Sequence, residues 1–177
     1  TCWSLKNSQN NSTAIDSIYN SDNYYRLYKY NSNNQKVYAI TPKFDNNLSF
    51  NNLIIEFDLY LNNPTDTLYV GFMADPTDTS TFVIIRKVTT GFTNRFHHIV
   101  VMGGNYTGTA RHIAFMIQKS AVVFLIDNVK ISALPQCLPS VDLNVKYNTN
   151  GTTSLNWIDY GSANNWEIEY GPSGFTH

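Results

Sequence analysis

One segment of the chain carries a complete strand pattern. Between residues 53 and 61, apolar side chains occupy every second position, and the intervening positions are mostly polar. The apolar set is Leu53, Ile55, Phe57, Leu59 and Leu61, and the opposite set is Ile54, Glu56, Asp58 and Tyr60. Side chains of a strand point to opposite faces in turn. One face of this strand therefore belongs to a core, and the other meets solvent or a groove.

Seven further runs rich in Val, Ile, Tyr, Phe and Thr predict strands at 24–30, 36–41, 67–74, 82–88, 96–102, 112–118 and 122–132. Turn-forming Asn, Asp, Gly and Pro residues separate them, and helical periodicity is almost absent. Eight such strands exceed what one flat sheet accommodates. The sequence therefore predicts an all-β fold, an antiparallel jelly-roll β-sandwich.

Two prolines, Pro135 and Pro139, interrupt the succession of strands, because proline lacks the backbone N–H that pairs one strand with the next. We place a domain boundary there, with a binding module at 1–134 and a second domain at 135–177. The second part predicts three strands, at 141–147, 153–157 and 165–170. Three strands are too few for an independent domain, so we expect the chain to be a segment of a longer polypeptide.

Composition limits the classes of partner. The formal net charge is −1, charged residues make up 14% of the chain, and no basic stripe interleaves with aromatics, which argues against nucleic acid. No apolar run approaches the roughly 20 residues of a membrane-spanning helix. Asn, Ser and Thr fill most polar positions, as is typical of secreted or cell-surface modules.

Two cysteines, Cys2 and Cys137, are too few for a four-thiolate zinc site and too far apart for a Cys-x-x-Cys redox motif. The first and last strands of a jelly roll commonly lie side by side, and these cysteines flank them. We therefore predict a Cys2–Cys137 disulfide; the alternatives are two free thiols or pairing outside this chain.

The second part resembles the first half of fibronectin type III domains in bacterial surface proteins. The matching residues are Cys137-Leu138-Pro139, Leu155-Asn156-Trp157 and the run 166–175. The resemblance covers about half of such a domain, and it implies a partial fibronectin-type-III-like β-sandwich.

The first part looks like the jelly-roll modules grouped as cleaved-adhesin or MAM-like domains, known from gingipain haemagglutinins. The matches are Cys2-Trp3 and the runs 39–42, 55–60, 68–73, 112–115 and 126–131. The resemblance implies adhesion to host proteins or glycans, often with structural calcium, and no catalysis.

For calcium, the resemblance points to Asp127 in the closing Ile-Asp-Asn-Val segment. Calcium takes six to eight oxygens, so Asp16, Asp22 and Asn23 of the polar N-terminal segment would have to contribute. Alternatively, Asp127 bonds backbone amides at a bend of the strand.

Tyrosines offer a candidate sugar platform, because a flat ring presents apolar area to a pyranose and a hydroxyl at its edge. Alternation places Tyr24, Tyr28 and Tyr30 on one face, and Tyr60 lies on the polar face of its own strand. The alternative for the first three is an aromatic cluster within the core.

Glu56 and Asp58 share a strand face, as the acids of a sandwich glycosidase do. Laminarinase-type enzymes use three acids at alternate positions, and Tyr60 occupies the third, which argues against catalysis. His97 and His98 are consecutive and therefore point to opposite faces, and His112 lies on another strand, so no histidine metal site is expected. Ser17 and Thr67 lie in Asp-Ser/Thr-aliphatic patterns that resemble a bacterial O-glycosylation signal.

Together these features favour a non-catalytic adhesion or carbohydrate- or protein-binding module of a secreted multidomain surface protein, with binding at loops on one rim. Its partners would be a glycan or a host or matrix protein, and further domains of the same polypeptide. The alternatives are a structural spacer and a sandwich glycoside hydrolase fragment.

Overall fold

The computed structural model describes residues 3–7, 25–29, 36–45, 48–90, 93, 95–118, 122–135, 138, 140–161, 163–172 and 176. The chain divides into two compact units, Thr1–Leu134 and Pro135–His177. None of the helices in this described part is long and apolar enough to cross a membrane.

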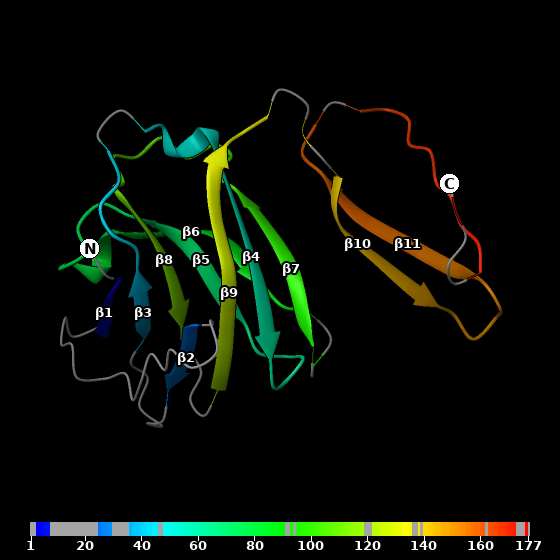
Figure 1. Cartoon of the computed structure of the whole chain (residues 1–177), viewed down its shortest axis with the longest axis horizontal. Coiled ribbons are helices and arrows are strands. Elements are labelled where there is room, and N and C mark those ends of the chain that lie inside the picture. The colour runs from blue at the N-terminus through cyan, green and yellow to red at the C-terminus, as the bar shows by residue number, and fades with distance from the viewer. Residues whose placement is uncertain are drawn as a thin grey trace. The chain divides into compact units, whose positions relative to one another are not determined.

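The first unit is an antiparallel β-sandwich, which confirms the predicted all-β class (Figure 1). One sheet has the strand order β1-β3-β8-β5-β6, and the other has the order β2-β9-β4-β7. The strands are β1 (Ser4–Asn7), β2 (Tyr25–Lys29), β3 (Val37–Ile40), β4 (Leu53–Leu61), β5 (Leu68–Met73), β6 (Phe82–Val88), β7 (Phe96–Met102), β8 (His112–Ile117) and β9 (Val122–Ala133). Two short 3-10 turns, η2 (Phe50–Asn52) and η3 (Thr79–Thr81), precede β4 and β6.

The pairing is that of a jelly roll, because β2–β9, β3–β8, β4–β7 and β5–β6 form nested pairs. Strand β1, which the sequence did not predict, adds to this arrangement beside β3. The strand beside β9 is therefore β2, whereas β1 lies in the other sheet. This corrects the premise for the Cys2–Cys137 disulfide, because Cys2 precedes β1. Both cysteines lie outside the described residues, so the disulfide itself stays a prediction.

The core lies between the two sheets and follows the predicted alternation. All five apolar residues of the 53–61 set are buried, whereas Glu56, Asp58 and Tyr60 are partly exposed. Aromatic rings from both sheets interlock at the centre: Phe57 meets Phe115 edge-on at 5.1 Å between ring centroids, and Trp3 stacks on Phe115 at 5.6 Å. Offset and edge-on contacts of this kind fix the packing of a sandwich core.

The second unit contains a hairpin of β10 (Ser140–Tyr147) and β11 (Thr153–Asp159). The predicted third strand at 165–170 is wrong: the described residues 163–171 have no strand assignment and pair with neither β10 nor β11. A strand exists only where its backbone groups form a ladder, and alternation alone does not supply one. Instead, Trp166 lies edge-on against Trp157, at 5.5 Å between ring centroids.

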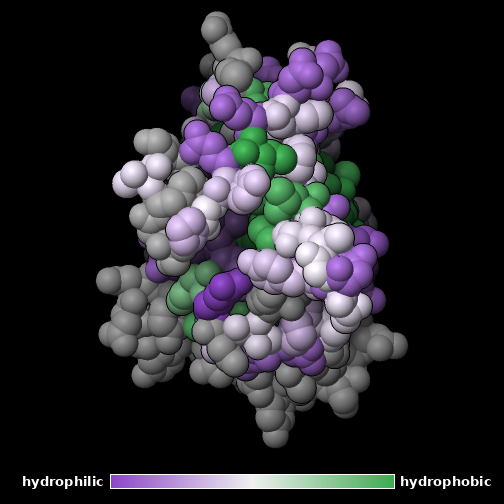
Figure 2. Space-filling view, turned by 90° about the vertical axis from the view of Figure 1, so that its right-hand side faces the viewer, coloured by the Kyte–Doolittle hydropathy of each residue, from purple (hydrophilic) through white to green (hydrophobic). Residues whose placement is uncertain are grey.

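Large apolar side chains remain exposed in this unit. They are Leu143, Val145, Tyr147, Ile158, Trp166, Ile168 and Tyr170. Figure 2 shows a face of the molecule on which hydrophobic residues reach the surface among hydrophilic ones. Several of these side chains line an apolar groove of about 790 Å³ formed within the second unit.

Candidate functional site

The outer face of the β2-β9-β4-β7 sheet carries three consecutive rows of aligned side chains. Register places Leu125 (β9), Tyr60 (β4) and Phe96 (β7) side by side, and we call them the aromatic row. The next row along the strands, the acidic row, is Asp127, Asp58 and His98. The third, the paired row, is Lys130, Glu56 and Val100. Neighbouring rows are two residues, or about 7 Å, apart along each strand.

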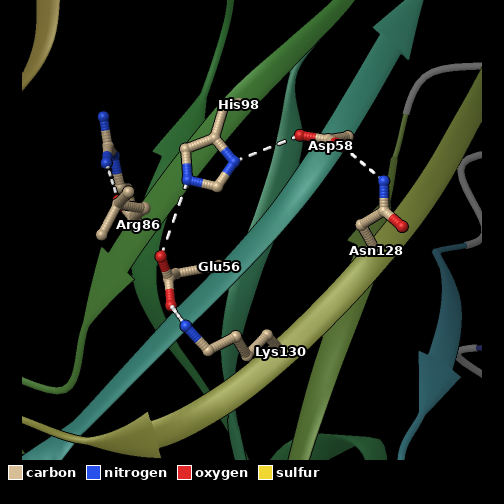
Figure 3. Close-up of polar contacts among 7 residues, drawn as sticks. Glu56, Asp58, Arg86, His98, Asn128 and Lys130 are labelled. Carbon is tan, nitrogen blue, oxygen red and sulfur yellow. Dashed lines mark hydrogen bonds and ion pairs between the residues drawn. The ribbon is translucent and has the colours of Figure 1, made fainter.

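Ionic and hydrogen-bonding contacts connect the acidic and paired rows (Figure 3). His98 Nδ1 lies 3.1 Å from Asp58 Oδ1, and its Nε2 lies 3.7 Å from Glu56 Oε1. Lys130 Nζ lies 2.9 Å from Glu56 Oε2. Asn128 Nδ2 donates to Asp58 Oδ2 at 2.7 Å. Each oxygen of Glu56 and Asp58 therefore faces a nitrogen from a neighbouring strand.

A β-bulge in β9 places Asn128 for this contact. The β4–β9 register shifts between Glu56 and Asp58, so that β9 carries one residue more than β4 across this stretch. Asn128 has φ 51°, in the left-handed region, which Asn adopts more readily than other residues with a side chain. Its backbone N–H donates to Asp127 Oδ1 at 2.7 Å. Asp127 thus bonds a backbone amide at the bend of its strand.

The aromatic row offers an apolar surface beside the acidic row. The rings of Tyr60 and Phe96 lie 5.7 Å apart between centroids and are tilted by 54°. Phe96 is 44% exposed although it belongs to a strand of a packed sheet. The sequence singled out Tyr60 but missed Phe96, since only the β4–β7 register brings the two together.

An arginine closes the edge of the sandwich near the paired row. Arg86 of β6 donates through Nη1 to the carbonyl oxygen of Val100 in β7, which joins the edge strands of the two sheets (Figure 3). The guanidinium therefore lies beside the row that already holds Lys130. Within the paired row, the charge of Lys130 is balanced by Glu56.

Neighbouring strands hold the carboxylates of Glu56 and Asp58, the two acids of the glycosidase alternative. A glycosidase needs one carboxyl that gives a proton to the leaving oxygen and one that attacks or activates water. Here both side chains contact cationic, amide or imidazole nitrogens of neighbouring strands, and Tyr60 occupies the third position.

The predicted calcium site is only partly described. Asp127 lies on the outer face, but Asp16, Asp22 and Asn23 lie outside the described residues. In the part of the chain that the structure describes, no three His, Cys, Asp or Glu side chains are grouped so that they could hold a metal. The calcium site stays a prediction.

The predicted sugar-binding tyrosines of the N-terminal segment and the predicted glycosylation sites also lie partly outside the described residues. The backbone of Tyr28 pairs with Val123, but its side chain is not described, and Tyr24, Tyr30 and Ser17 lie outside the described residues. Thr67 is half-buried just before β5. O-glycosylation at either position stays a prediction.

The histidines behave as strand residues. His97 and His98 lie on opposite faces of β7, and His112 is buried with Nδ1 2.8 Å from the carbonyl oxygen of Thr41. Burial lowers the pKa of His97, and the positive charge of Arg95 lowers it further. Of the three, His98 contacts Asp58 and Glu56 in the candidate site.

The rim of the sandwich contains a pocket of about 300 Å³ between the loops that precede β4 and follow β7. Its polar lining residues are Ser49, Asn51, Tyr106, Thr107, Thr109 and Arg111. This is the rim type of site that the sequence favoured. The pocket lies at the low end of the size range of ligand sites. Of its two aromatic lining residues, Phe50 is buried and Tyr106 is half-buried.

Comparison with known proteins identifies the fold. No protein-family model matches the chain, and no curated protein sequence matches it. Among solved structures, a cleaved adhesin domain of Lys-gingipain matches with 12% sequence identity and a TM-score of 0.51, over 73% of this chain and 89% of that chain. This similarity supports the β-sandwich fold.

Structures of a family 29 carbohydrate-binding module also match. The form complexed with cellulohexaose has 8% identity and a TM-score of 0.49, over 75% of this chain and 89% of that chain. The form complexed with mannohexaose has 7% identity and a TM-score of 0.49, over 75% of this chain and 93% of that chain.

Proposed function

We propose that the first unit is a non-catalytic carbohydrate-binding module, and that it holds its glycan on the outer face of the β2-β9-β4-β7 sheet. The observation that supports this most is the contact between the partly exposed Tyr60 and the exposed Phe96, directly beside the acidic row. The aromatic row offers apolar area, and the acidic and paired rows offer fixed polar groups.

Sugar rings need this combination. The C–H face of a pyranose packs on an aromatic ring, while its hydroxyls exchange water for protein hydrogen bonds. The polar groups here are held in place by contacts across three strands, so that little side-chain freedom is lost when a ligand binds. The 54° tilt between Tyr60 and Phe96 suits a glycan that turns between successive residues rather than a flat crystalline surface.

The module would belong to a secreted, multidomain surface protein. In this proposal the second unit is the N-terminal part of a fibronectin-type-III-like domain, and its open apolar face is covered by further strands. The proposal also includes calcium at Asp127, which belongs to the acidic row of this face, and a Cys2–Cys137 disulfide.

A glycan array probed with the whole chain tests the proposal. We expect a defined set of oligosaccharides to bind, and both Tyr60→Ala and Phe96→Ala to weaken binding by at least about tenfold, since stacked aromatic anchors dominate such contacts. Tyr147→Ala is the matched control, because it removes an equally large, 82% exposed ring from the second unit.

Two outcomes would contradict the proposal. If no glycan binds, the spacer interpretation is favoured. If binding persists in both face variants but is lost when Arg111 or Asn51 is replaced, the site is the rim pocket.

A further inference from the structure

The tip of the β10–β11 hairpin contains the one Asn-Gly pair of the sequence, Asn150-Gly151. Both residues are exposed, and Gly151 has φ +79°. Asn-Gly is favoured in tight hairpin turns, because glycine adopts positive φ without strain. The missing side chain also leaves the backbone nitrogen of Gly151 unhindered. This nitrogen and the side-chain amide carbon of Asn150 are therefore placed to react with each other.

Two donors of Thr152 hold the side-chain oxygen of Asn150. Its Oδ1 accepts from the backbone N–H of Thr152 at 3.1 Å and from the hydroxyl Oγ1 of the same residue at 2.7 Å. Donors at a carbonyl oxygen stabilise the negative charge that develops there when a nucleophile adds to the carbon. The turn therefore surrounds the amide oxygen of Asn150 as an oxyanion hole surrounds a reacting carbonyl.

Asn148 fixes the direction in which the Thr152 hydroxyl donates. Nδ2 of Asn148 donates to Thr152 Oγ1 at 2.9 Å and to Ser154 Oγ at 3.0 Å. A hydroxyl has one proton to give, and it accepts on its lone pairs. With Asn148 donating to it, Thr152 directs its own proton to Asn150. Both donors at Asn150 Oδ1 are thus held in place before any reaction begins, and little reorganisation is needed.

One contact opposes the reaction. The backbone N–H of Gly151, which would be the nucleophile, donates to the carbonyl oxygen of Asn148 at 3.2 Å. This distance lies at the long end of N–H···O hydrogen bonds, so the contact is a weak one. It also lies at the exposed tip of a two-stranded ladder, where local opening costs little free energy. The turn therefore binds the electrophile more firmly than the nucleophile.

We propose that Asn150 is a site of spontaneous modification, and that the folded hairpin promotes it. The Gly151 nitrogen loses its proton to solvent and bonds to Cγ of Asn150, and negative charge develops on Oδ1. The Cγ–Nδ2 bond then breaks, and the nitrogen leaves as ammonia with a proton from solvent. Water opens the resulting cyclic imide at one of its two carbonyls, which gives aspartate or isoaspartate. No oxidant or reductant takes part.

The two products change the hairpin differently. Each adds a negative charge at its tip. Aspartate keeps an oxygen that Thr152 can reach, whereas isoaspartate leads the main chain through the former side chain and lengthens it by one carbon. The bond from the Asn148 N–H to the Thr152 carbonyl, 2.8 Å in the present turn, then no longer closes in the same register. The next pair, Tyr147 and Thr153, lines the apolar groove of the second unit, so the change reaches that groove.

Incubation of the intact chain at mildly alkaline pH tests the proposal. Peptide mass spectrometry follows the replacement of the amide NH₂ by OH, and an isoaspartate methyltransferase assay detects the isoaspartate. Asn150 should react at least about tenfold faster than Asn105, an equally exposed asparagine of the first unit that is followed by tyrosine. The same incubation in concentrated urea removes the turn. Asn150 should react at least as fast in the folded chain as in urea.

Thr152→Val removes the hydroxyl donor and keeps the shape and the backbone N–H. We expect the reaction at Asn150 to slow several-fold in this variant. Thr153→Val is the matched control, an exposed threonine of the same hairpin, and should leave the rate unchanged. A folded chain that reacts at least about tenfold more slowly than the chain in urea would overturn the proposal, because the turn would then protect Asn150. An unchanged or faster reaction in Thr152→Val would overturn it as well, and the urea comparison needs no variant.

Discussion

Both units of this chain contain strands with large apolar side chains, but these side chains are buried in the first unit and exposed in the second. In the first unit, Phe57, Phe72 and Phe115 are fully buried between two sheets. In the second, Leu143 is 67% exposed and Tyr147 is 82% exposed, although both belong to a well-formed hairpin. Alternation thus creates an apolar face, but only a second sheet buries it.

As a consequence, the two units expose different kinds of surface. In the first unit the apolar faces of the two sheets pack against each other in the core. The outer face of the β2-β9-β4-β7 sheet therefore presents a mixed aromatic and polar surface suited to a soluble ligand. The second unit exposes the apolar face itself, where Trp157 and Trp166 line the groove. Contiguous exposed apolar surface often marks a site that another chain segment or protein covers. We therefore propose that the first unit serves recognition and the second serves assembly.

Hydrogen exchange should show the largest contrast. Amides of β4 and β5 lie in central strands of a closed sandwich, and their exchange should require global unfolding of that unit. Amides of β10 and β11 belong to a two-stranded ladder, which is marginal by itself. We expect the former to exchange at least about a thousandfold more slowly. Equal, strong protection of both in a monomer would show that the second unit is closed.

Truncating an aromatic side chain should lower the free energy of unfolding by several kcal/mol more in the first unit than in the second. Phe57→Ala removes a buried ring that contacts Phe115, and such changes cost about 3–5 kcal/mol. Tyr147→Ala removes an exposed ring and should change the free energy of unfolding by no more than about 0.5 kcal/mol. Urea unfolding followed by fluorescence measures both. A comparable loss at Tyr147 would mean that something covers it.

Alanine substitutions at two glycines also compare the packing of the two units. At Gly71, an added Cβ would lie 2.2 Å from the carbonyl oxygen of Val83 and 2.7 Å from the Phe82 ring, so Gly71→Ala should cost about 1–3 kcal/mol through overpacking. At Gly151 nothing lies within 4 Å of an added Cβ. Gly151→Ala should lower the free energy of unfolding by only about 1 kcal/mol, because the residue has φ +79°, in the left-handed region. This loss is confined to the hairpin. Thermal melting with each alanine variant tests this order, and a larger loss at Gly151 would contradict it.

The smallest expected effect is a pH dependence of the first unit alone. The pKa of His97 is lowered from 6.5 in the folded state, first by burial and then by Arg95. The neutral form therefore stabilises the fold above about pH 6.5, and this contribution is lost as the pH falls through the folded-state value. Melting temperatures between pH 7.5 and pH 5 should fall less in His97→Gln than in the wild type. Parallel curves would exclude His97 as the cause.

Much of the first unit could be predicted from the sequence because its strands alternate cleanly. The ranges 82–88 and 96–102 match β6 and β7, and the inward face of 53–61 is as predicted. Strand β1 was missed because Leu5 is the one apolar residue among its four. The strand predicted at 165–170 failed because pattern does not supply a pairing partner.

The candidate site was harder to predict because it depends on register. Glu56, Asp58 and Tyr60 could be placed on one face from alternation alone. That Phe96 and His98 would lie opposite Tyr60 and Asp58 follows from the nested β4–β7 pairing, which one strand does not encode. The bulge at Asn128 shifts the β9 register by one residue, so even a correct strand list would have misaligned Asp127.

The most direct test of the account is an NMR titration of the isotope-labelled chain with a neutral oligosaccharide that binds on the array. We predict that amide shifts change at 58–60, 96–98 and 125–128, where the aromatic and acidic rows lie, and that the amides of β10 and β11 do not move. Shifts centred on the rim pocket at 48–51 and 106–111, or on the groove of the second unit, would contradict the assignment of recognition to the outer face of the β2-β9-β4-β7 sheet.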